Sequence, residues 1–124
     1  MLFVCIGNSG RSQMAEAFLN ALAGGKIIAV SAGTIPAESV DPVVIEIMQE
    51  EGIDISTARP KQLTAEMMQD VDKVITMGCG VEEACPAVRV HSEDWGLPDP
   101  KGKSREEIRK VRDEIKDRVM KLLQ

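Results

Sequence analysis

The sequence predicts an α/β fold of three layers, in which helices cover both faces of a four-stranded, mostly parallel sheet. Short apolar runs rich in Val and Ile, typical of buried strands, alternate with longer segments whose apolar residues recur at helical spacing. Alternation of strand and helix along a chain is typical of parallel sheets with helical crossovers. Strands are expected at 2–6, 26–30, 73–77 and 87–90, and helices at 11–23, 43–51, 64–69 and 105–123.

Capping signals set the ends of these helices. Two glycines at 24 and 25 end the first helix, because glycine readily adopts the left-handed conformation of a C-terminal cap. Asp41-Pro42 is the pattern of an N-cap followed by the first helical position. Ser104 to Glu107 form a capping box, which opens the long C-terminal helix.

Composition indicates one globular domain spanning 1–124, since 44% of the residues are hydrophobic and 28% are charged. No apolar run approaches the roughly 18 residues of a membrane span. The net charge of −5 argues against nucleic acid or an anionic membrane as partner, because both favour a basic face.

Cellular compartment is indicated by the first residues and by the cysteines. Residues 1–4 carry no basic segment of a secretion signal, so the cytoplasm is expected. In a reducing compartment, an odd number of cysteines, here three, more often serves catalysis, metal binding or core packing than structural disulfides.

Residues 5–12 read CIGNSGRS and connect the first strand to the first helix, at the carboxyl edge where parallel sheets bind ligands. Backbone N–H groups and the positive helix end converge there on one point that suits a tetrahedral oxyanion. Arg11 adds a bidentate donor, and the same positive groups favour the thiolate of Cys5. Ser12 can donate to that thiolate, and Asn8 is expected to hold the shape of the loop. The alternative interpretation is that Cys5 is a buried strand residue.

The segment CIGNSGRSQMAEA resembles the signature loop of the low-molecular-weight protein tyrosine phosphatase superfamily, and more closely that of its arsenate reductase branch. The likeness continues through VSAGT at 30–34, GIDIS at 52–56, VITMGCG at 74–80, ACP at 84–86, EDWGLPDP at 93–100 and IRKVRDEI at 108–115. It implies that Cys5 is the nucleophile, Arg11 the anion clamp and Ser12 the thiolate partner. It further implies Asp99 as general acid and an oxyanion loop made of Gly7, Asn8, Ser9, Gly10 and Arg11.

Arsenate reduction also needs two electrons, and thiols are the redox groups that this sequence offers. Cys79 and Cys85 are therefore the candidate redox partners of Cys5. A second thiolate that attacks Cys5 while it carries arsenic expels arsenite and leaves a disulfide. No bound cofactor or metal is expected, and the external reductant is thioredoxin, a glutaredoxin-like protein or a small thiol. Residues Asn8, Glu16 and Ser31 match in type a monovalent cation site of some reductases that the sequence resembles.

The redox segment departs from the resembled pattern. Five residues separate Cys79 from Cys85, whereas six separate the corresponding pair of the thioredoxin-coupled members. The MGCG and ACP segments instead look like relatives that use an external low-molecular-weight thiol. Gly10 also stands where many reductases carry another cysteine. These departures concern the electron relay and leave the anion loop unchanged.

Two other functions remain open. A phosphatase would use the same Cys5, Arg11 and Asp99 on phosphate monoesters. The chain has no tyrosine, however, and a pocket poor in aromatic walls suits a bare oxyanion better; Trp95 is expected to anchor its loop to the core. A non-catalytic arsenite- or zinc-binding module is third, and its zinc ligands would be Cys5, Cys79, Cys85 and His91, at intervals unlike those of zinc fingers.

Overall fold

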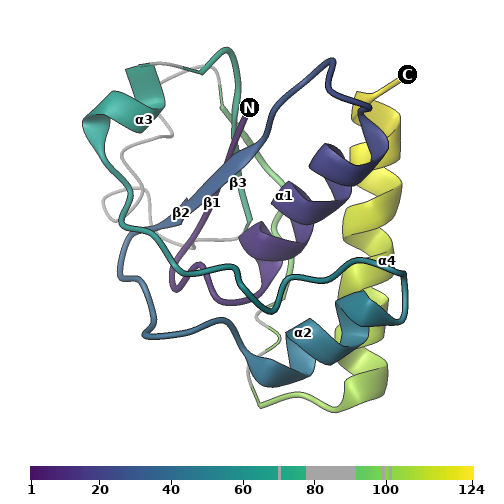
Figure 1. Ribbon diagram of the computed structural model, residues 1–124. Helices are drawn as coiled ribbons and strands as arrows, with labels where there is room; N and C mark the ends of the chain where they lie inside the picture. The colour runs from purple at the N-terminus through teal and green to yellow at the C-terminus, as the bar shows by residue number, and fades with distance from the viewer. Residues whose placement is uncertain (70, 78–91, 99, 101) are drawn as a thin grey trace.

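The computed structural model describes residues 1–69, 71–77, 92–98, 100 and 102–124 (Figure 1). Four strands form one sheet in the order β2-β1-β3-β4, and the three pairings between them are all parallel. The strands are β1 (Leu2–Cys5), β2 (Val30–Gly33), β3 (Val74–Thr76) and β4 (Ser92–Asp94). The helices are α1 (Arg11–Leu22), α2 (Pro42–Gln49), α3 (Ala65–Gln69) and α4 (Arg105–Leu122). The predicted fold class is confirmed.

Both faces of β1 are buried, as its unbroken apolar sequence predicts. Phe3 and Cys5 face the larger core, which α1, α2 and α4 cover, while Leu2 and Val4 face a smaller core on the side of α3. Figure 1 shows the same division, with α3 apart from the other three helices. Cys5 therefore ends a strand that is fixed on both sides.

The second strand begins at Val30, later than the sequence pattern indicated, and the predicted strand over 26–30 is wrong. The side chain of Asn20 explains the difference, because it donates to Ala29 O at 3.1 Å and accepts from Ala29 N at 2.8 Å. Ile28 is 72% exposed, so part of the apolar run faces solvent. The strand predicted at 87–90 lies outside the described residues, and β4 lies at Ser92–Asp94.

The predicted helix ends are confirmed. Asp41 accepts a hydrogen bond from Val43 N at 2.9 Å, and Ser104 Oγ accepts one from Glu107 N at 3.2 Å. Gly24 follows α1 with φ of 61°, in the left-handed region expected of a C-terminal glycine. Within the described residues, no helix combines the length and the apolar character needed to cross a membrane.

Ion pairs connect α4 to α2. Glu50 accepts from Arg109 Nη2 and from Arg112 Nη1, both at 2.8 Å, and Lys116 Nζ lies 3.0 Å from Glu51 Oε1. Hydrogen bonds from Arg109 and then from Arg112 lower the pKa of Glu50 to about 2. Because α2 follows the segment that borders the β1–α1 loop, these pairs support that side of the molecule.

Candidate active site

The loop between β1 and α1 is packed into the protein. Asn8 and Ser12 are fully buried, and Cys5 and Arg11 are 2% and 5% exposed. Cys5 is the last residue of β1 and Arg11 is the first residue of α1, so two rigid elements hold the ends of the loop. The residues that the sequence analysis singled out between 5 and 12 are thus brought together.

The sulfur of Cys5 lies beside two polar groups. Asn8 N donates to Cys5 Sγ at 3.1 Å, and Ser12 Oγ lies 2.8 Å from the same sulfur. Ser12 Oγ also accepts a hydrogen bond from Asn8 Nδ2 at 2.7 Å, and its own hydrogen is available to donate to a sulfur anion at Cys5. Donors of this kind stabilise a sulfur anion over a neutral thiol.

Asn8 has the left-handed backbone that closes the loop, with φ of 50°. Its side-chain oxygen accepts from Lys61 N at 2.9 Å and from Gln13 Nε2 at 3.0 Å. These two donors fix the orientation of the amide, so that its nitrogen faces Ser12.

Gln13 was not identified from the sequence. Its side chain is 1% exposed, and besides Asn8 Oδ1 its Nε2 contacts Asn8 O at 3.2 Å and Arg59 O at 3.0 Å. Because Arg59 and Lys61 lie about fifty residues further along the chain, no spacing in the sequence indicates this contact.

Arg11 is held by the ends of two other strands. Its Nη1 donates to Met77 O at 2.7 Å, just beyond β3, and to Leu97 O at 2.9 Å, beyond β4. Both bonds engage the same nitrogen of a planar guanidinium, so they set the direction of the whole group. The sequence predicted that Arg11 lies at this edge of the sheet, but it did not indicate that the carbonyls of Met77 and Leu97 would accept its hydrogen bonds.

Two glycines allow neighbouring segments to approach the loop closely. A Cβ at Gly33 would lie 2.5 Å from Ile6 O and 3.0 Å from Asn8 N. A Cβ at Gly10 would lie 2.9 Å from Cγ of Pro100. Pro100 therefore covers the position where many of the resembled reductases carry a cysteine.

A cavity of about 350 Å³ opens above the loop. It is lined by the loop residues Cys5, Gly7, Ser9, Gly10 and Arg11 and by a group of apolar residues, called the rim below: Ile6, Ile35, Pro36, Ala37 and Pro100. The rim segment runs beside the loop, because Ile35 N donates to Ile6 O and Ala37 N donates to Gly7 O, both at 2.9 Å. The arrangement suits a small anion bound at the end of an apolar opening.

The residues matched to a monovalent cation site contact a lysine. Lys61 Nζ lies 3.6 Å from Glu16 Oε1, to which Ser31 Oγ donates at 3.3 Å. An ammonium group thus provides a positive charge beside these oxygens. In the described part of the chain, no group of three or more His, Cys, Asp and Glu side chains is placed to hold a metal ion.

Several predicted site residues lie outside the described residues: Asp99, Cys79, Cys85 and His91. Their flanking residues Met77, Pro98 and Pro100 are described. The roles of the general acid and of the redox thiols therefore stay predictions.

Comparison with known proteins identifies the family to which this chain is similar. Residues 1–124 match the model of the family described as low molecular weight phosphotyrosine protein phosphatase. The glutaredoxin arsenate reductase of Synechocystis sp. is 42% identical over 125 residues, which cover 99% of this chain and 95% of the relative.

Two solved structures are also similar. An arsenate reductase in the phosphate-binding state is 43% identical, with a TM-score of 0.86 over 98% of this chain and 94% of that one. A thioredoxin-dependent arsenate reductase from Corynebacterium glutamicum is 41% identical, with a TM-score of 0.81; the match covers 98% of this chain and 58% of that one.

Proposed function

Because the chain belongs to the low molecular weight phosphotyrosine protein phosphatase family, we propose that it uses this fold as an arsenate reductase, with Cys5 as the nucleophile. One observation supports this assignment above the others. Cys5 lines the cavity, and Asn8 N and Ser12 Oγ lie at 3.1 and 2.8 Å from its sulfur. A buried cysteine of purely structural use would not need two such partners.

Oxyanion binding is the first step. Arsenate enters the cavity, and its oxygens are bound by the backbone of Gly7, Ser9 and Gly10 and by the guanidinium of Arg11, while Asn8 N–H donates to Cys5 Sγ. The carbonyls of Met77 and Leu97 hold Nη1 of that guanidinium and thereby orient it. The site attracts the anion locally, although the whole chain has a net charge of −5.

Nucleophilic attack is the second step. The thiolate of Cys5 forms a bond to arsenic, the bond from arsenic to one hydroxyl of hydrogen arsenate breaks, and that hydroxyl leaves as water after it has received a proton. Asp99 is proposed to supply that proton. The hydrogen bond from Ser12 holds the sulfur anion until it attacks. The product is a Cys5 adduct of arsenic in the +5 state.

Electron transfer is the third step. A second thiolate attacks Cys5 Sγ, the sulfur–arsenic bond breaks, and its electron pair stays on arsenic, which leaves as arsenite. Two sulfurs are oxidised to a disulfide as arsenic gains two electrons. Cys79 or Cys85 is the proposed second thiol, and a thiol reductant then reduces the disulfide.

The reductant is proposed to be thioredoxin, a glutaredoxin-like protein or a small thiol. Two similar proteins, a glutaredoxin arsenate reductase and a thioredoxin-dependent arsenate reductase, support a thiol partner. A cytoplasmic location is proposed with it, because the reaction consumes thiols that a reducing compartment regenerates.

A phosphatase using Cys5, Arg11 and Asp99 is the second candidate. The apolar rim of the cavity favours this function, because a cavity of about 350 Å³ has room for an organic group beyond a bare oxyanion. The arsenite- or zinc-binding module is weaker, since the intervals between Cys79, Cys85 and His91 are unlike those of zinc fingers.

One assay with two parallel substrates tests these functions. Protein is incubated with arsenate and a thiol reductant, and separately with an aryl phosphate, for the wild type and for Cys5→Ser, Cys79→Ser and Cys85→Ser. Arsenite formation that Cys5→Ser abolishes and that Cys79→Ser or Cys85→Ser impairs supports the reductase. Ester hydrolysis unaffected by the last two changes supports the phosphatase. Tight metal retention with neither activity overturns both.

A further inference from the structure

We propose that Asp94 is a positioning residue for Arg11, because its carboxylate fixes the two chain segments whose carbonyls hold the guanidinium. The inference rests on the oxyanion-binding role proposed above for Arg11. It assigns a function to an exposed carboxylate at the end of β4 that is separate from the proposed acid, Asp99.

A single oxygen of Asp94 accepts two hydrogen bonds. Thr76 Oγ1 donates to Asp94 Oδ1 at 3.0 Å, and Gly96 N donates to the same oxygen at 3.1 Å. Thr76 is the last residue of β3 and is 3% exposed, and Gly96 forms a turn with φ of 58°. The carboxylate therefore joins the end of β3 to the turn that follows β4.

Each residue that Asp94 holds is followed directly by a residue that holds Arg11. Met77 follows Thr76, and its carbonyl accepts from Arg11 Nη1 at 2.7 Å. Leu97 follows Gly96, and its carbonyl accepts from the same nitrogen at 2.9 Å. The bonds to Asp94 thus contribute to the separation of these two carbonyls, and the direction of the guanidinium depends on that separation.

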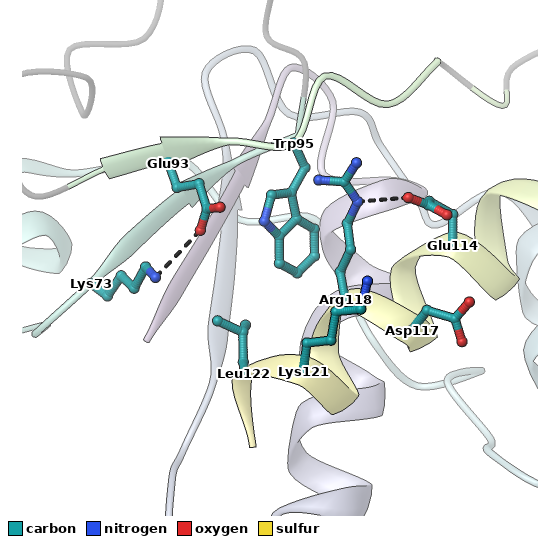
Figure 2. A pocket seen from close by; sticks show the side chains of 8 residues that line it. All are labelled: Lys73, Glu93, Trp95, Glu114, Asp117, Arg118, Lys121 and Leu122. Carbon is teal, nitrogen blue, oxygen red and sulfur yellow. Dashed lines mark hydrogen bonds and ion pairs between the residues drawn. The ribbon is translucent and has the colours of Figure 1, made fainter. Parts of the chain in front are cut away.

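Trp95 holds the same segment against the core independently of Asp94. Its backbone N donates to Thr76 O at 2.8 Å, and its indole, 5% exposed, lies 5.7 Å from the ring of Phe3. Figure 2 shows the indole beside the side chain of Arg118, whose Cζ lies 5.7 Å from the ring centroid. Replacement of Asp94 is therefore expected to move the Gly96 turn while the segment stays folded.

The expected effect is on anion affinity and turnover. A misplacement of about 1 Å in a group that positions substrate can cost up to 10²-fold in rate. Because Trp95 limits the displacement, we expect Asp94→Ala to weaken binding of inorganic phosphate by about tenfold and to lower kcat for arsenate by a similar factor. Asp94→Asn keeps an oxygen that accepts both bonds, so its affinity should stay within about twofold of wild type.

A matched control comes from the neighbouring residue. Glu93 lies on the same strand and forms an ion pair with Lys73 at 3.3 Å, also between β4 and the start of β3 (Figure 2). The two side chains are 51% and 39% exposed, so the pair contributes little. Glu93→Ala should leave phosphate affinity and kcat unchanged.

The test is titration of the full chain with inorganic phosphate, with arsenate kinetics in parallel, for wild type, Asp94→Ala, Asp94→Asn and Glu93→Ala. Asp94→Ala is also combined with Arg11→Lys. In that double variant, Asp94→Ala should cause no further loss of phosphate affinity, because Asp94 acts through Arg11. If Asp94→Ala does not fold, Thr76→Val removes one of the two donors and should weaken phosphate binding severalfold.

Three results would overturn the proposal. Asp94→Ala could bind phosphate as tightly as wild type, or Asp94→Asn could lose as much phosphate affinity as Asp94→Ala. In the third, Asp94→Ala would weaken phosphate binding of the Arg11→Lys variant as much as it weakens that of wild type. A wild type that binds neither phosphate nor arsenate would instead refute the oxyanion site itself. The failure of the proposed function is thereby distinguished from the failure of this inference.

Discussion

Asn8 donates its side-chain N–H to the hydroxyl of Ser12 at 2.7 Å, and this contact determines what Ser12 offers to Cys5. With Ser12 Oγ held by this bond, its hydroxyl hydrogen can be donated to a sulfur anion 2.8 Å away. The loop thus holds its nucleophile through side chains that are set before any substrate arrives, which is the form of preorganisation that favours catalysis.

Removal of the Asn8 amide should therefore reduce both the reactivity of the Cys5 sulfur and the enzyme activity. We expect Asn8→Gly to lower kcat by about tenfold, since it loses an indirect donor while glycine keeps the left-handed backbone at no steric cost. The rate of Cys5 alkylation measures the effect on the sulfur, and steady-state kinetics measure the effect on kcat. Asn8→Ala should show the same loss plus about 1 kcal/mol of instability from its positive φ. An alkylation rate equal to that of wild type would contradict the assignment.

Gln13 should contribute more to the free energy of unfolding than an exposed glutamine on a helix does. Gln13→Leu leaves Asn8 O and Arg59 O without the Nε2 donor, and an unsatisfied buried group costs about 1–3 kcal/mol. Urea unfolding measures this loss. Gln49 is exposed on α2, so Gln49→Leu should change the free energy of unfolding by no more than about 0.5 kcal/mol. Equal effects of the two substitutions would refute the role of Gln13.

The sequence was sufficient for the parts of the fold and site that local patterns encode. The loop from Cys5 to Ser12 is contiguous, and its strand and helix are set by apolar periodicity, so the residues around the sulfur could be named in advance. The caps at Asp41 and Ser104 are likewise local.

What the sequence could not provide depends on contacts between distant segments. The backbone of Arg59 and Lys61 meets Asn8 and Gln13 only after the chain has folded, and the same holds for the carbonyls around Arg11. The start of β2 was misplaced for a similar reason, because the side chain of Asn20 takes up the backbone of Ala29. Hydrophobic periodicity contains no information about such polar contacts.

Gly10 should tolerate no side chain without movement of Pro100. A Cβ at position 10 would lie 2.9 Å from Pro100 Cγ and 3.7 Å from Val44 Cγ2. We expect Gly10→Ala to displace the Pro100 segment and to raise KM for arsenate severalfold, because Pro100 lines the cavity. Pro100→Ala in the same chain should restore part of the affinity, and steady-state kinetics of the three variants measure the coupling. Additive effects of the two substitutions would show that the contact is unimportant.

Lys61 should make activity independent of the choice of monovalent cation. Its ammonium lies 3.6 Å from Glu16 Oε1, so wild-type turnover in potassium and in sodium salts should agree within about twofold. Lys61→Met removes this charge, and activity should then fall modestly and respond to added potassium. Lys26→Met, which changes an exposed lysine beyond α1, provides the control. A strong potassium dependence of the wild type would contradict this expectation.

Protonation of Glu50 should make the protein less stable in acid. Its pKa is lowered from 4.5 to about 2 by Arg109 and Arg112, so its carboxylate stabilises the folded state fully above about pH 4.5. That contribution is lost as the pH falls from about 4.5 towards 2, because the folded state must then take up a proton and lose the ion pairs. Glu50→Gln should therefore flatten the fall of Tm between these two pH values, with the largest difference from wild type at neutral pH. Glu66→Gln, which changes an exposed glutamate of α3, should leave the slope unchanged. High salt should narrow the difference between wild type and Glu50→Gln, since the side chains of Glu50 and Arg109 are 41% and 42% exposed.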